Sequence, residues 1–242
     1  MTVKNTSKTA LITGGAKRIG KEIALALAKD GYNIALHYNT SHRKVETLAK
    51  SIRKLGRQCE TFPCDLSDPE DSLRLLNTVK KTFKNISLLV NNASLFKNDS
   101  VKRINLKLMQ DHLNIHLISP YVLTSEFNKK FKNGHIINIL DRHVTQNNTQ
   151  FTSYLLSKKA LQSLTEISAI ELAPKIRVNA IAPGLILPPE NETKTHLLKR
   201  IKNVPLKSIG NPKQIAQTVL FLDHNPYITG QTIYVDGGEH LV

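Results

Sequence analysis

The sequence has few aromatic residues, few cysteines and no long apolar run. Tryptophan is absent, and aromatic residues make up 5% of the 242 positions, which argues against a surface that stacks the bases of single-stranded nucleic acid. Cys59 and Cys64 lack the second pair that would complete a zinc site, so we expect two reduced thiols in the core and no metal ion. No segment approaches the ~20 apolar residues that a membrane-spanning helix requires.

Signals for export, repetition and long linkers are absent as well. Residues 1–15 contain no apolar stretch of signal-peptide length, and we see no internal repeat or low-complexity linker. Acidic residues are outnumbered, since 34 lysines and arginines stand against 19 aspartates and glutamates, for a net charge of +15. Such charge attracts anions, including nucleic acid and acidic membranes, but the basic residues are scattered rather than gathered in a block. We therefore expect a cytoplasmic protein of one domain, residues 1–242, with neither nucleic acid nor membrane as a partner.

What the sequence does contain is an alternation of short β-rich segments with longer helical ones. The β-rich segments are 9–13, 33–38, 59–62, 87–92, 135–140, 177–182 and 231–236. Most are apolar almost throughout, as in strands buried on both faces. In the helical segment 16–30, Ile19, Ile23 and Leu27 form one stripe, and Gly31 ends the helix. The pattern predicts an α/β fold with one doubly wound parallel sheet of about seven strands and helices on both faces.

The stretch "TGGAKRIG", residues 13–20, connects the first strand to the first helix. Gly14 permits a tight turn there, and Gly20 permits close packing of the helix on the strand. Phosphate oxygens would meet the free N–H groups at the start of that helix. The turn therefore predicts a dinucleotide site, although Arg18 stands where such turns commonly have glycine.

The stretch "HYNTSHRK", residues 37–44, follows the second strand and contains no acidic residue. A cofactor without a 2′-phosphate is usually held there by Asp or Glu, which would repel a 2′-phosphate. Ser41 and Arg43 offer polar and basic groups instead, and the neighbouring turn adds Lys17 and Arg18. This pattern favours NADP(H) as the cofactor, with an exposed polar loop as the alternative.

Tyr154 and Lys158 lie four residues apart in the helical segment 151–173, which places them on one face. An ammonium group near a phenol favours the phenolate, so we expect Lys158 to lower the pKa of Tyr154 and make it a proton donor near neutral pH. Asp141 ends the strand at 135–140 on the expected ligand side of the sheet. The three side chains are predicted to converge on one pocket.

Several motifs occur together in a characteristic order: "TGGAKRIG", "CDL" (64–66), "NNAS" (91–94), "YLLSK" (154–158), "IAPG" (181–184) and "DGG" (236–238). With them the chain resembles the short-chain dehydrogenase/reductase family, which has a Rossmann-type fold, over essentially its whole length. That family usually has serine at the position of Asp141 and glycine at that of Arg18. Both departures resemble one branch, the pteridine reductases and dihydromonapterin reductases, as do "HYN" and the ending "DGGEHL".

The resemblance implies a role for each matching residue. Asp141, Tyr154 and Lys158 would be catalytic: nicotinamide would deliver a hydride, Tyr154 and Asp141 would manage the proton, and Lys158 would hold the ribose. The implied cofactor contacts are Gly14, Lys17, Arg18, Ile19, Gly20, His37, Tyr38, Asn39, Ser41, Asp65, Leu66, Asn92, Ala93, Ser94, Lys158, Pro183 and Gly184. The implied substrate contacts are Arg18, Ser94, Phe96, Asp141 and Tyr154, with the ring of Phe96 lying flat against a pterin and Arg18 over the cofactor phosphates.

Two features leave alternatives open. His116 stands where the wider family has an asparagine that helps to hold a water. Pro120 lacks an N–H, so the carbonyl of residue 116 is free to bind that water whatever the side chain is. Alternatively, His116 is only a packing residue beside a kink. The segment near 185–205 is expected to cover the pocket, but it carries no motif that identifies the substrate.

The function that fits these residues best is the NADPH-dependent reduction of a dihydropterin or of dihydrofolate to the tetrahydro form, within tetrahydrofolate metabolism. One alternative is a carbonyl reductase acting on another substrate, such as a 3-oxoacyl thioester. Another is a non-catalytic NADP-binding sensor. By family resemblance, the helical segments 105–132 and 151–173 would pair between subunits in a homotetramer.

Overall fold

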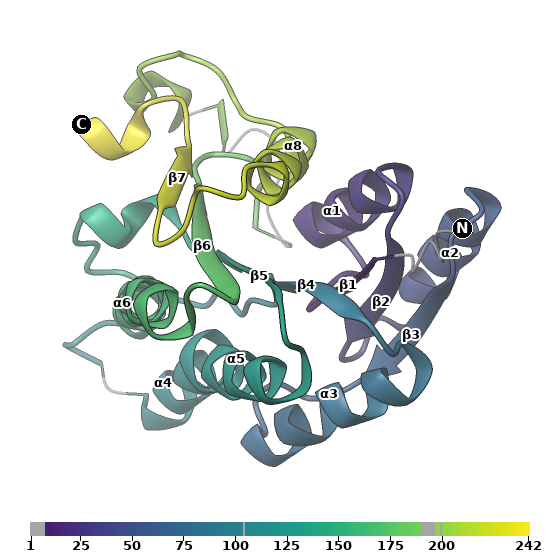
Figure 1. Ribbon diagram of the computed structural model, residues 1–242. Coiled ribbons are helices and arrows are strands. Elements are labelled where there is room, and N and C mark those ends of the chain that lie inside the picture. Colours follow the sequence, from purple (N-terminus) through teal and green to yellow (C-terminus); the bar gives the residue numbers. More distant parts are fainter. Residues whose placement is uncertain (1–7, 104, 190–196, 199) are drawn as a thin grey trace, which may run out of the picture.

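The computed structural model describes residues 8–103, 105–189, 197–198 and 200–242 and centres on one parallel sheet (Figure 1). Its strands are β1 (Thr9–Ile12), β2 (Asn33–Tyr38), β3 (Cys59–Pro63), β4 (Ile86–Asn91), β5 (Gly134–Ile139), β6 (Ile176–Pro183) and β7 (Thr232–Val235). They lie side by side in the order β3-β2-β1-β4-β5-β6-β7, and every neighbouring pair is parallel. All seven predicted strands and the predicted α/β fold are confirmed.

Helices cover both faces of this sheet, as predicted (Figure 1). One face carries α1 (Arg18–Lys29), α2 (His42–Lys54) and α8 (Pro212–His224); the other carries α3 (Pro69–Thr82), α4 (Leu106–Leu113), α5 (Ser119–Lys130) and α6 (Thr152–Leu172). Successive strand residues point to opposite faces. Ala10 and Ile12 therefore lie in the core beneath α1, whereas Leu11 packs with Leu76 of α3.

The first helix begins two residues later and ends one residue earlier than the predicted segment 16–30, and Gly31 lies just beyond its end as expected. Gly31 adopts a left-handed φ of 102°, and its N–H bonds to the carbonyl of Ala28. The N–H of Tyr32 reaches back to the carbonyl of Leu27. This pair of bonds is a Schellman motif, which satisfies the last free carbonyls of α1 and turns the chain into β2.

Short helical turns complete the chain: η1 (Asn114–Ile118), η2 (Arg142–Thr145), η3 (Ile201–Asn203) and η4 (Glu239–Leu241). The first of these is a π-turn between α4 and α5, and it contains His116. Pro120 follows it and cannot donate a backbone hydrogen bond, which accounts for a local change of helical pitch at this point. A π-turn therefore lies at the place where the sequence predicted a kink.

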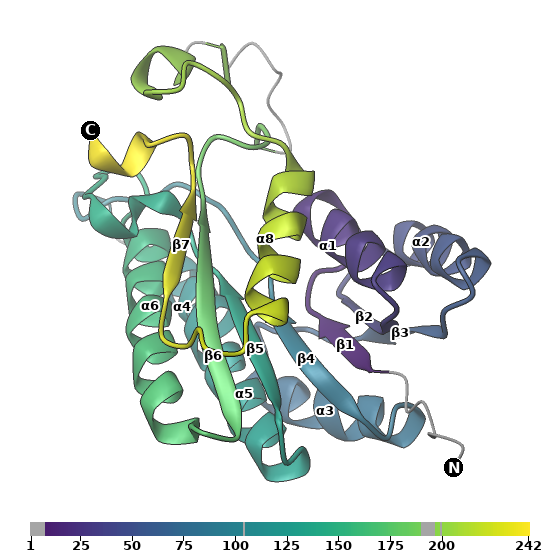
Figure 2. The same cartoon turned by 45° about the horizontal axis from the view of Figure 1, so that its top comes forward.

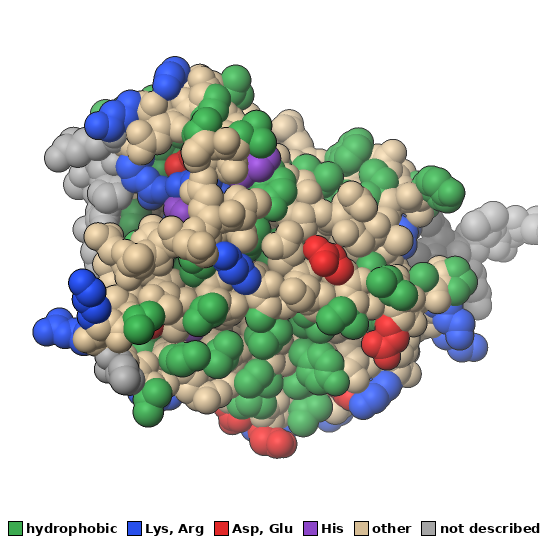
Figure 3. Space-filling model, turned by 90° about the vertical axis from the view of Figure 1, so that its left-hand side faces the viewer, with side chains coloured by type: hydrophobic (Ala, Val, Ile, Leu, Met, Phe, Trp, Pro, Cys, Tyr) green, Lys and Arg blue, Asp and Glu red, His purple; other side chains and the backbone are tan. Residues whose placement is uncertain are grey.

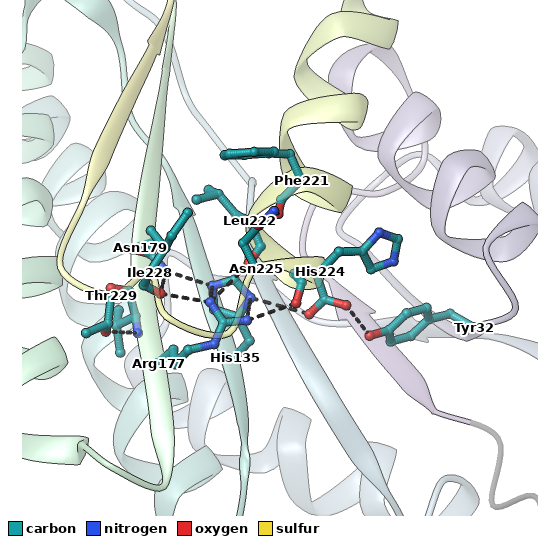
Figure 4. Close-up of polar contacts among 12 residues, drawn as sticks. Tyr32, His135, Arg177, Asn179, Phe221, Leu222, His224, Asn225, Ile228 and Thr229 are labelled. Atoms are coloured by element: carbon teal, nitrogen blue, oxygen red, sulfur yellow. Dashed lines mark hydrogen bonds and ion pairs between the residues drawn. The ribbon is translucent and has the colours of Figure 1, made fainter.

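A polar network at the amino ends of β5 and β6 fixes the end of α8 to the sheet (Figure 4). Arg177 donates to the carbonyls of Leu222 and Asp223, the last residues of α8 before its end, at 3.0 and 3.1 Å. The Asp223 carboxylate accepts a 2.6 Å bond from the hydroxyl of Tyr32. Cationic groups at a helix C-terminus satisfy its free carbonyls and its dipole, so this network is structural.

The carboxyl ends of the strands lie at the opposite end of the sheet. There the chain leaves β6 for the segment that leads to α8, and the turn after β7 lies beside it (Figure 2). The strand order reverses between β1 and β4, which is where open α/β sheets bind ligands. Among the described helices, none has the length and apolarity needed to cross a membrane.

Candidate active site

The glycine-rich turn after β1 is held in place by hydrogen bonds with His37, a residue of β2. The N–H of Gly14 donates to Nδ1 of His37 at 3.0 Å, and Nε2 of His37 lies 3.0 Å from the carbonyl of Cys64. Burial lowers the pKa of His37 to about 4, so the ring is neutral, with its proton on Nε2. Both ring nitrogens are thus engaged by the main chain. The side chain fixes the shape of the turn and has no polar atom left for a ligand.

The turn is also joined to the end of β4. Asn92 donates through Nδ2 to the carbonyls of Thr13 and Gly14, at 2.9 and 3.1 Å. A Cβ added to Gly20 would lie 2.4 Å from the carbonyl oxygen of Gly14, which is too close for any side chain. Ala93 donates its N–H to the hydroxyl of Thr13 at 3.0 Å. The motifs around residues 14 and 92 therefore form one unit at the switch point of the sheet.

Arg18 keeps the backbone conformation of the glycine that it replaces. Its φ is 55°, one of only two positive values among the described non-glycine residues. A side chain in this region costs about 1–3 kcal/mol, which the surrounding structure must offset. Nη2 of Arg18 donates to the carbonyl of Pro188 at 2.7 Å. The side chain thereby connects the first turn with the segment after β6; its predicted contact with cofactor phosphates stays a prediction.

The end of β2 carries polar and basic groups without a nearby acid in the first turn of α2. Ser41 precedes α2 and makes no side-chain capping bond, while the N–H of His42 donates to the carbonyl of Thr40 at 3.0 Å. The N–H groups that follow in the first turn are available to an anion. A hollow of about 460 Å³ lies between α1 and α2 and is lined by three cations, Lys21, Arg43 and Lys44. This environment suits a phosphate group.

The other predicted cofactor contacts near β2 and β3 form hydrogen bonds within the protein. Asn39 donates to Oδ1 of Asp65 at 3.3 Å, and the hydroxyl of Tyr38 lies 3.0 Å from Nδ1 of His42. The carbonyl of Leu66 accepts a 2.7 Å bond from a buried serine of α5. On the other side of the switch point, Gly184 follows Pro183 and packs so closely that a Cβ would lie 2.4 Å from the side chain of Asp236.

The three predicted catalytic residues do come together. The hydroxyl of Tyr154, on α6, donates to Oδ2 of Asp141 at 2.9 Å. Lys158, one turn further along α6, places Nζ 5.9 Å from the Tyr154 ring centroid and donates to the carbonyl of Ile139 at 2.7 Å. The tyrosine and the lysine are both buried. The strand end and the helix face meet as the spacing predicted.

The predicted lowering of the Tyr154 pKa by Lys158 is wrong for this structure. Burial raises the pKa of Tyr154 well above its ordinary value, and the charge and hydrogen bond of Asp141 raise it further. Burial also lowers the pKa of Lys158 to about 8, against the opposing effect of Asp141. The carboxylate touches the phenol while the ammonium group lies further away and faces a backbone carbonyl, so Asp141 outweighs Lys158. Tyr154 therefore stays protonated, hydrogen-bonded to a carboxylate.

His116 packs edge-on against Tyr154 and uses both ring nitrogens to position the groups around it. Its Nε2 accepts from the N–H of Leu95 at 3.1 Å and lies 3.0 Å from the hydroxyl of Ser94. Its Nδ1 therefore carries the proton and lies 2.8 Å from the hydroxyl of Ser157, which donates to the carbonyl of Tyr154 at 2.6 Å. Burial lowers the pKa of His116 well below its usual value, which agrees with this neutral form. The water near residue 116 stays a prediction.

Aromatic rings border the phenol. Phe96 lies edge-on to Tyr154, with ring centroids 4.8 Å apart, and stacks on Phe151 at 4.5 Å. Phe96 is 44% exposed, so the ring has room for a further flat partner. The sequence did not single out Phe151. The expected substrate segment, residues 185–205, is described only in part, since residues 190–196 and 199 lie outside the described residues.

The sequence reasoning also missed His143, on η2. Its Nδ1 lies 2.6 Å from Oδ1 of Asp141, and its backbone N–H donates to the same oxygen at 2.9 Å. The two contacts arise because Asp141 caps the turn that begins at Arg142. An aspartate two residues before a histidine at a strand end is the signal that could have revealed this pair.

Comparisons with known proteins agree on the family. A family model described as enoyl-(acyl carrier protein) reductase, adh_short_C2, matches residues 14–240. A 3-oxoacyl-[acyl-carrier-protein] reductase FabG of Staphylococcus epidermidis is 32% identical over 97% of this chain and all of its own length. FolM alternative dihydrofolate reductase 1 from Brucella canis, whose crystal structure is complexed with NADP, is 38% identical in sequence to this chain. The two structures superpose with a TM-score of 0.93, and the match covers 97% of this chain and 94% of that one. A short chain dehydrogenase from Burkholderia cenocepacia, in complex with NADP, is 27% identical with a TM-score of 0.90, over 96% and 97%. The chain therefore belongs to the short-chain dehydrogenase/reductase family.

Proposed function

We propose that this protein reduces a dihydropterin or dihydrofolate to its tetrahydro form, with NADPH as the reductant. The observation that carries the proposal is the 2.9 Å hydrogen bond between Tyr154 and Asp141. A ketone reductase protonates an oxygen, whereas reduction of a pterin C=N bond requires a proton on a ring nitrogen. A carboxylate bound to the phenol, in place of the usual serine, forms a coupled proton-donating pair for that task.

The cofactor is NADP(H). The Brucella canis and Burkholderia cenocepacia structures contain NADP, which confirms the expectation from the sequence. The residues present fit this group, because the first turns of α1 and α2 carry no acidic residue and Arg43 and Lys44 line the hollow beside them. When bound, NADPH supplies the hydride. Lys17, Arg18 and Ser41 are proposed to hold its phosphates, and Lys158 its ribose.

The protein residues divide the remaining work. Tyr154 gives its hydroxyl proton to the ring nitrogen of the substrate, and Asp141 orients the phenol. Neutral His116 holds the hydroxyl of Ser94 beside the phenol of Tyr154. We propose that the exposed side of Phe96 stacks on the flat heterocycle and that Arg18 reaches its polar edge.

The relatives support two substrate classes. The FolM structure of Brucella canis, an alternative dihydrofolate reductase, favours a pterin or folate, and its identity of 38% exceeds the 32% of the Staphylococcus epidermidis FabG. The FabG relative favours the second candidate, a 3-oxoacyl thioester reductase. We favour the pterin or folate because of Asp141, since the reduction of a ketone does not require a carboxylate at this position.

A substrate panel tests the proposal. NADPH oxidation is followed with dihydrobiopterin, dihydromonapterin, dihydrofolate and an acetoacetyl thioester. We expect turnover of at least one pterin or folate, and turnover of the thioester alone would reject the assignment. Tyr154→Phe serves as the matched variant: it should abolish turnover and leave NADPH binding, measured by fluorescence, nearly intact. If Tyr154→Phe retains full turnover, Tyr154 is not the proton donor, and the mechanism proposed for this site is wrong.

A further inference from the structure

The carboxylate of Asp141 has two different neighbours, and the proposed reaction uses only one of them. Oδ2 accepts the hydrogen bond from Tyr154, whereas Oδ1 faces the backbone N–H and the ring Nδ1 of His143. Tyrosine, aspartate and histidine thus form a continuous line of hydrogen bonds. Its outer end is the imidazole ring on η2.

The outer end of this line reaches solvent. The side chains of His143 and Asp141 are 20% and 21% exposed, whereas Tyr154 is 6% exposed. Among the described residues, no group bonds to Nε2 of His143, so that nitrogen is available to water. Imidazole has one nitrogen to take a proton and another to give one, which suits it to proton transfer near neutral pH.

Two charged or titratable groups near the phenol, Lys158 and His116, are hydrogen-bonded to other partners. Nζ of Lys158 donates to the carbonyl of Ile139, and both nitrogens of His116 are engaged with serine hydroxyls and a backbone N–H. Arg142, the neighbour of His143 in η2, pairs with the buried carboxylate of Glu239 at 2.8 Å. Among the described residues, the charged groups beside this line of bonds are Lys158, next to the Tyr154 ring, and the Arg142–Glu239 pair, whose carboxylate lies 3.6 Å from Arg200.

We propose that His143 relays the proton that restores Tyr154 after each turnover from solvent, through Asp141. Solvent gives a proton to Nε2 as the proton on Nδ1 passes to Oδ1 of Asp141. Proton exchange with water then takes the proton from Nε2 and returns one to Nδ1, which restores the starting tautomer of His143. The carboxyl group turns about its Cβ–Cγ bond and gives that proton to the phenolate oxygen of Tyr154. One proton moves inward for each proton that the substrate takes, and no electron is transferred. The inference rests on the proposed function only in requiring Tyr154 to be the proton donor.

Two substitutions separate relay from positioning. His143→Asn keeps a hydrogen-bond donor near Oδ1 of Asp141 but cannot carry a proton, and His143→Ala removes both properties. We expect both variants to lose at least ~10-fold in kcat, less than the ~10²–10⁴-fold effect of a direct general acid, because water can still reach Asp141 slowly, while the affinity for NADPH is unchanged. Added imidazole should raise the kcat of His143→Ala in proportion to its concentration. His224→Ala is the matched control, because it removes the histidine of a comparable pair, with Asp30 at 2.9 Å, far from the site.

The outcomes are distinguishable. If His143→Asn turns over like the wild type, the histidine only positions Asp141 and the relay is wrong. If His143→Ala keeps its kcat across the pH range, protons reach Asp141 directly from water and the proposal fails. Should His143→Ala unfold, the Asn variant and the solvent isotope effect on wild-type kcat decide, since a relay predicts an isotope effect that the Asn variant changes. If the wild type reduces only a thioester, the pterin assignment fails, and the same variants test the relay with that substrate.

Discussion

A carboxylate at position 141 changes what the neighbouring phenol can do. A serine there would share a neutral hydrogen bond, whereas Asp141 holds a negative charge 2.9 Å from the Tyr154 oxygen. Burial raises the pKa of Tyr154, and the charge of Asp141 raises it further and keeps the phenol protonated. Burial opposes the ionisation of Asp141, but its bonds to His143 lower the pKa of that carboxyl group. The pair therefore titrates as a unit and holds one proton ready near neutral pH.

Replacing that carboxylate should separate the two substrate classes. We expect Asp141→Ser to lower kcat/KM for dihydropterins by at least ~100-fold, because a general acid–base group contributes 10²–10⁴-fold. Any reduction of an acetoacetyl thioester should be unchanged or faster, since the serine restores what ketone-reducing relatives usually have. Steady-state kinetics with both substrates measures this. Asp111→Ser, at a surface pair with Lys107, is the control. Undiminished pterin turnover by Asp141→Ser would contradict the role of the carboxylate.

At the scale of elements, the site is built where two connections meet: the turn after β1 and the end of β4. His37 reaches up from β2 and bonds to the turn, and Asn92 crosses from β4 to bond to it from the side. These contacts are made by main-chain atoms of the turn, so its shape depends on neighbours that are distant in sequence. A buried neutral histidine also makes this element sensitive to acid.

The stability of this turn should fall with acidity. The pKa of His37 is about 4 in the folded protein, against ~6.5 for an unperturbed histidine. The unfolded chain therefore binds more protons between these values, so stability is full above pH 6.5 and is lost as the pH falls toward 4. Linkage gives a loss of about 2 kcal/mol between pH 7.5 and pH 5 from this residue alone.

Urea unfolding of wild type and His37→Gln at the two pH values measures this contribution. Glutamine offers both a donor and an acceptor but does not titrate. Other buried histidines, such as His116 and His135, respond to acid in both proteins and cancel in the comparison. We expect the variant to lose about 2 kcal/mol less than the wild type over this range. Equal losses would mean that His37 is not the neutral, buried group described above.

Elements and their contacts differ in how far the sequence could predict them. Most of the seven strands were predictable because they are short apolar runs buried on both faces, as β1 and β4 are, and Gly31 and Pro120 mark a helix end and a change of helical pitch. The contact of Asp141 with His143 has a local signal that was overlooked, because an aspartate at a strand end caps the turn that follows it. The contact of Arg18 with Pro188 has no such signal, because the two residues lie 170 positions apart in the chain. The sign of the Tyr154 pKa shift depended on distances and burial that spacing alone does not give.

At the scale of the whole molecule, one face stands out as apolar. Exposed hydrophobic side chains lie on α4, α5 and α6: Leu106, Met109, Tyr121, Leu156, Ile167 and Ile170. Figure 3 shows hydrophobic side chains gathered on the side of the molecule that α4 and α6 form. Contiguous apolar patches of this kind usually mark an interface. The helices concerned are those that the family resemblance assigns to subunit pairing, so we propose that this face joins the subunits of a homotetramer.

Charged substitutions on this face should break the assembly. Ile167 and Ile170 are 59% and 83% exposed in the isolated chain, and a glutamate at either position would place an uncompensated charge inside the interface. We expect the wild type to sediment as a tetramer and the double variant Ile167→Glu, Ile170→Glu as a smaller species, without loss of secondary structure. Leu55→Glu, at a 42% exposed leucine at the end of α2, is the matched control and should leave the mass unchanged. If the wild type sediments as a monomer, the proposed interface does not form. If the double variant still sediments as a tetramer, the subunit contacts lie elsewhere.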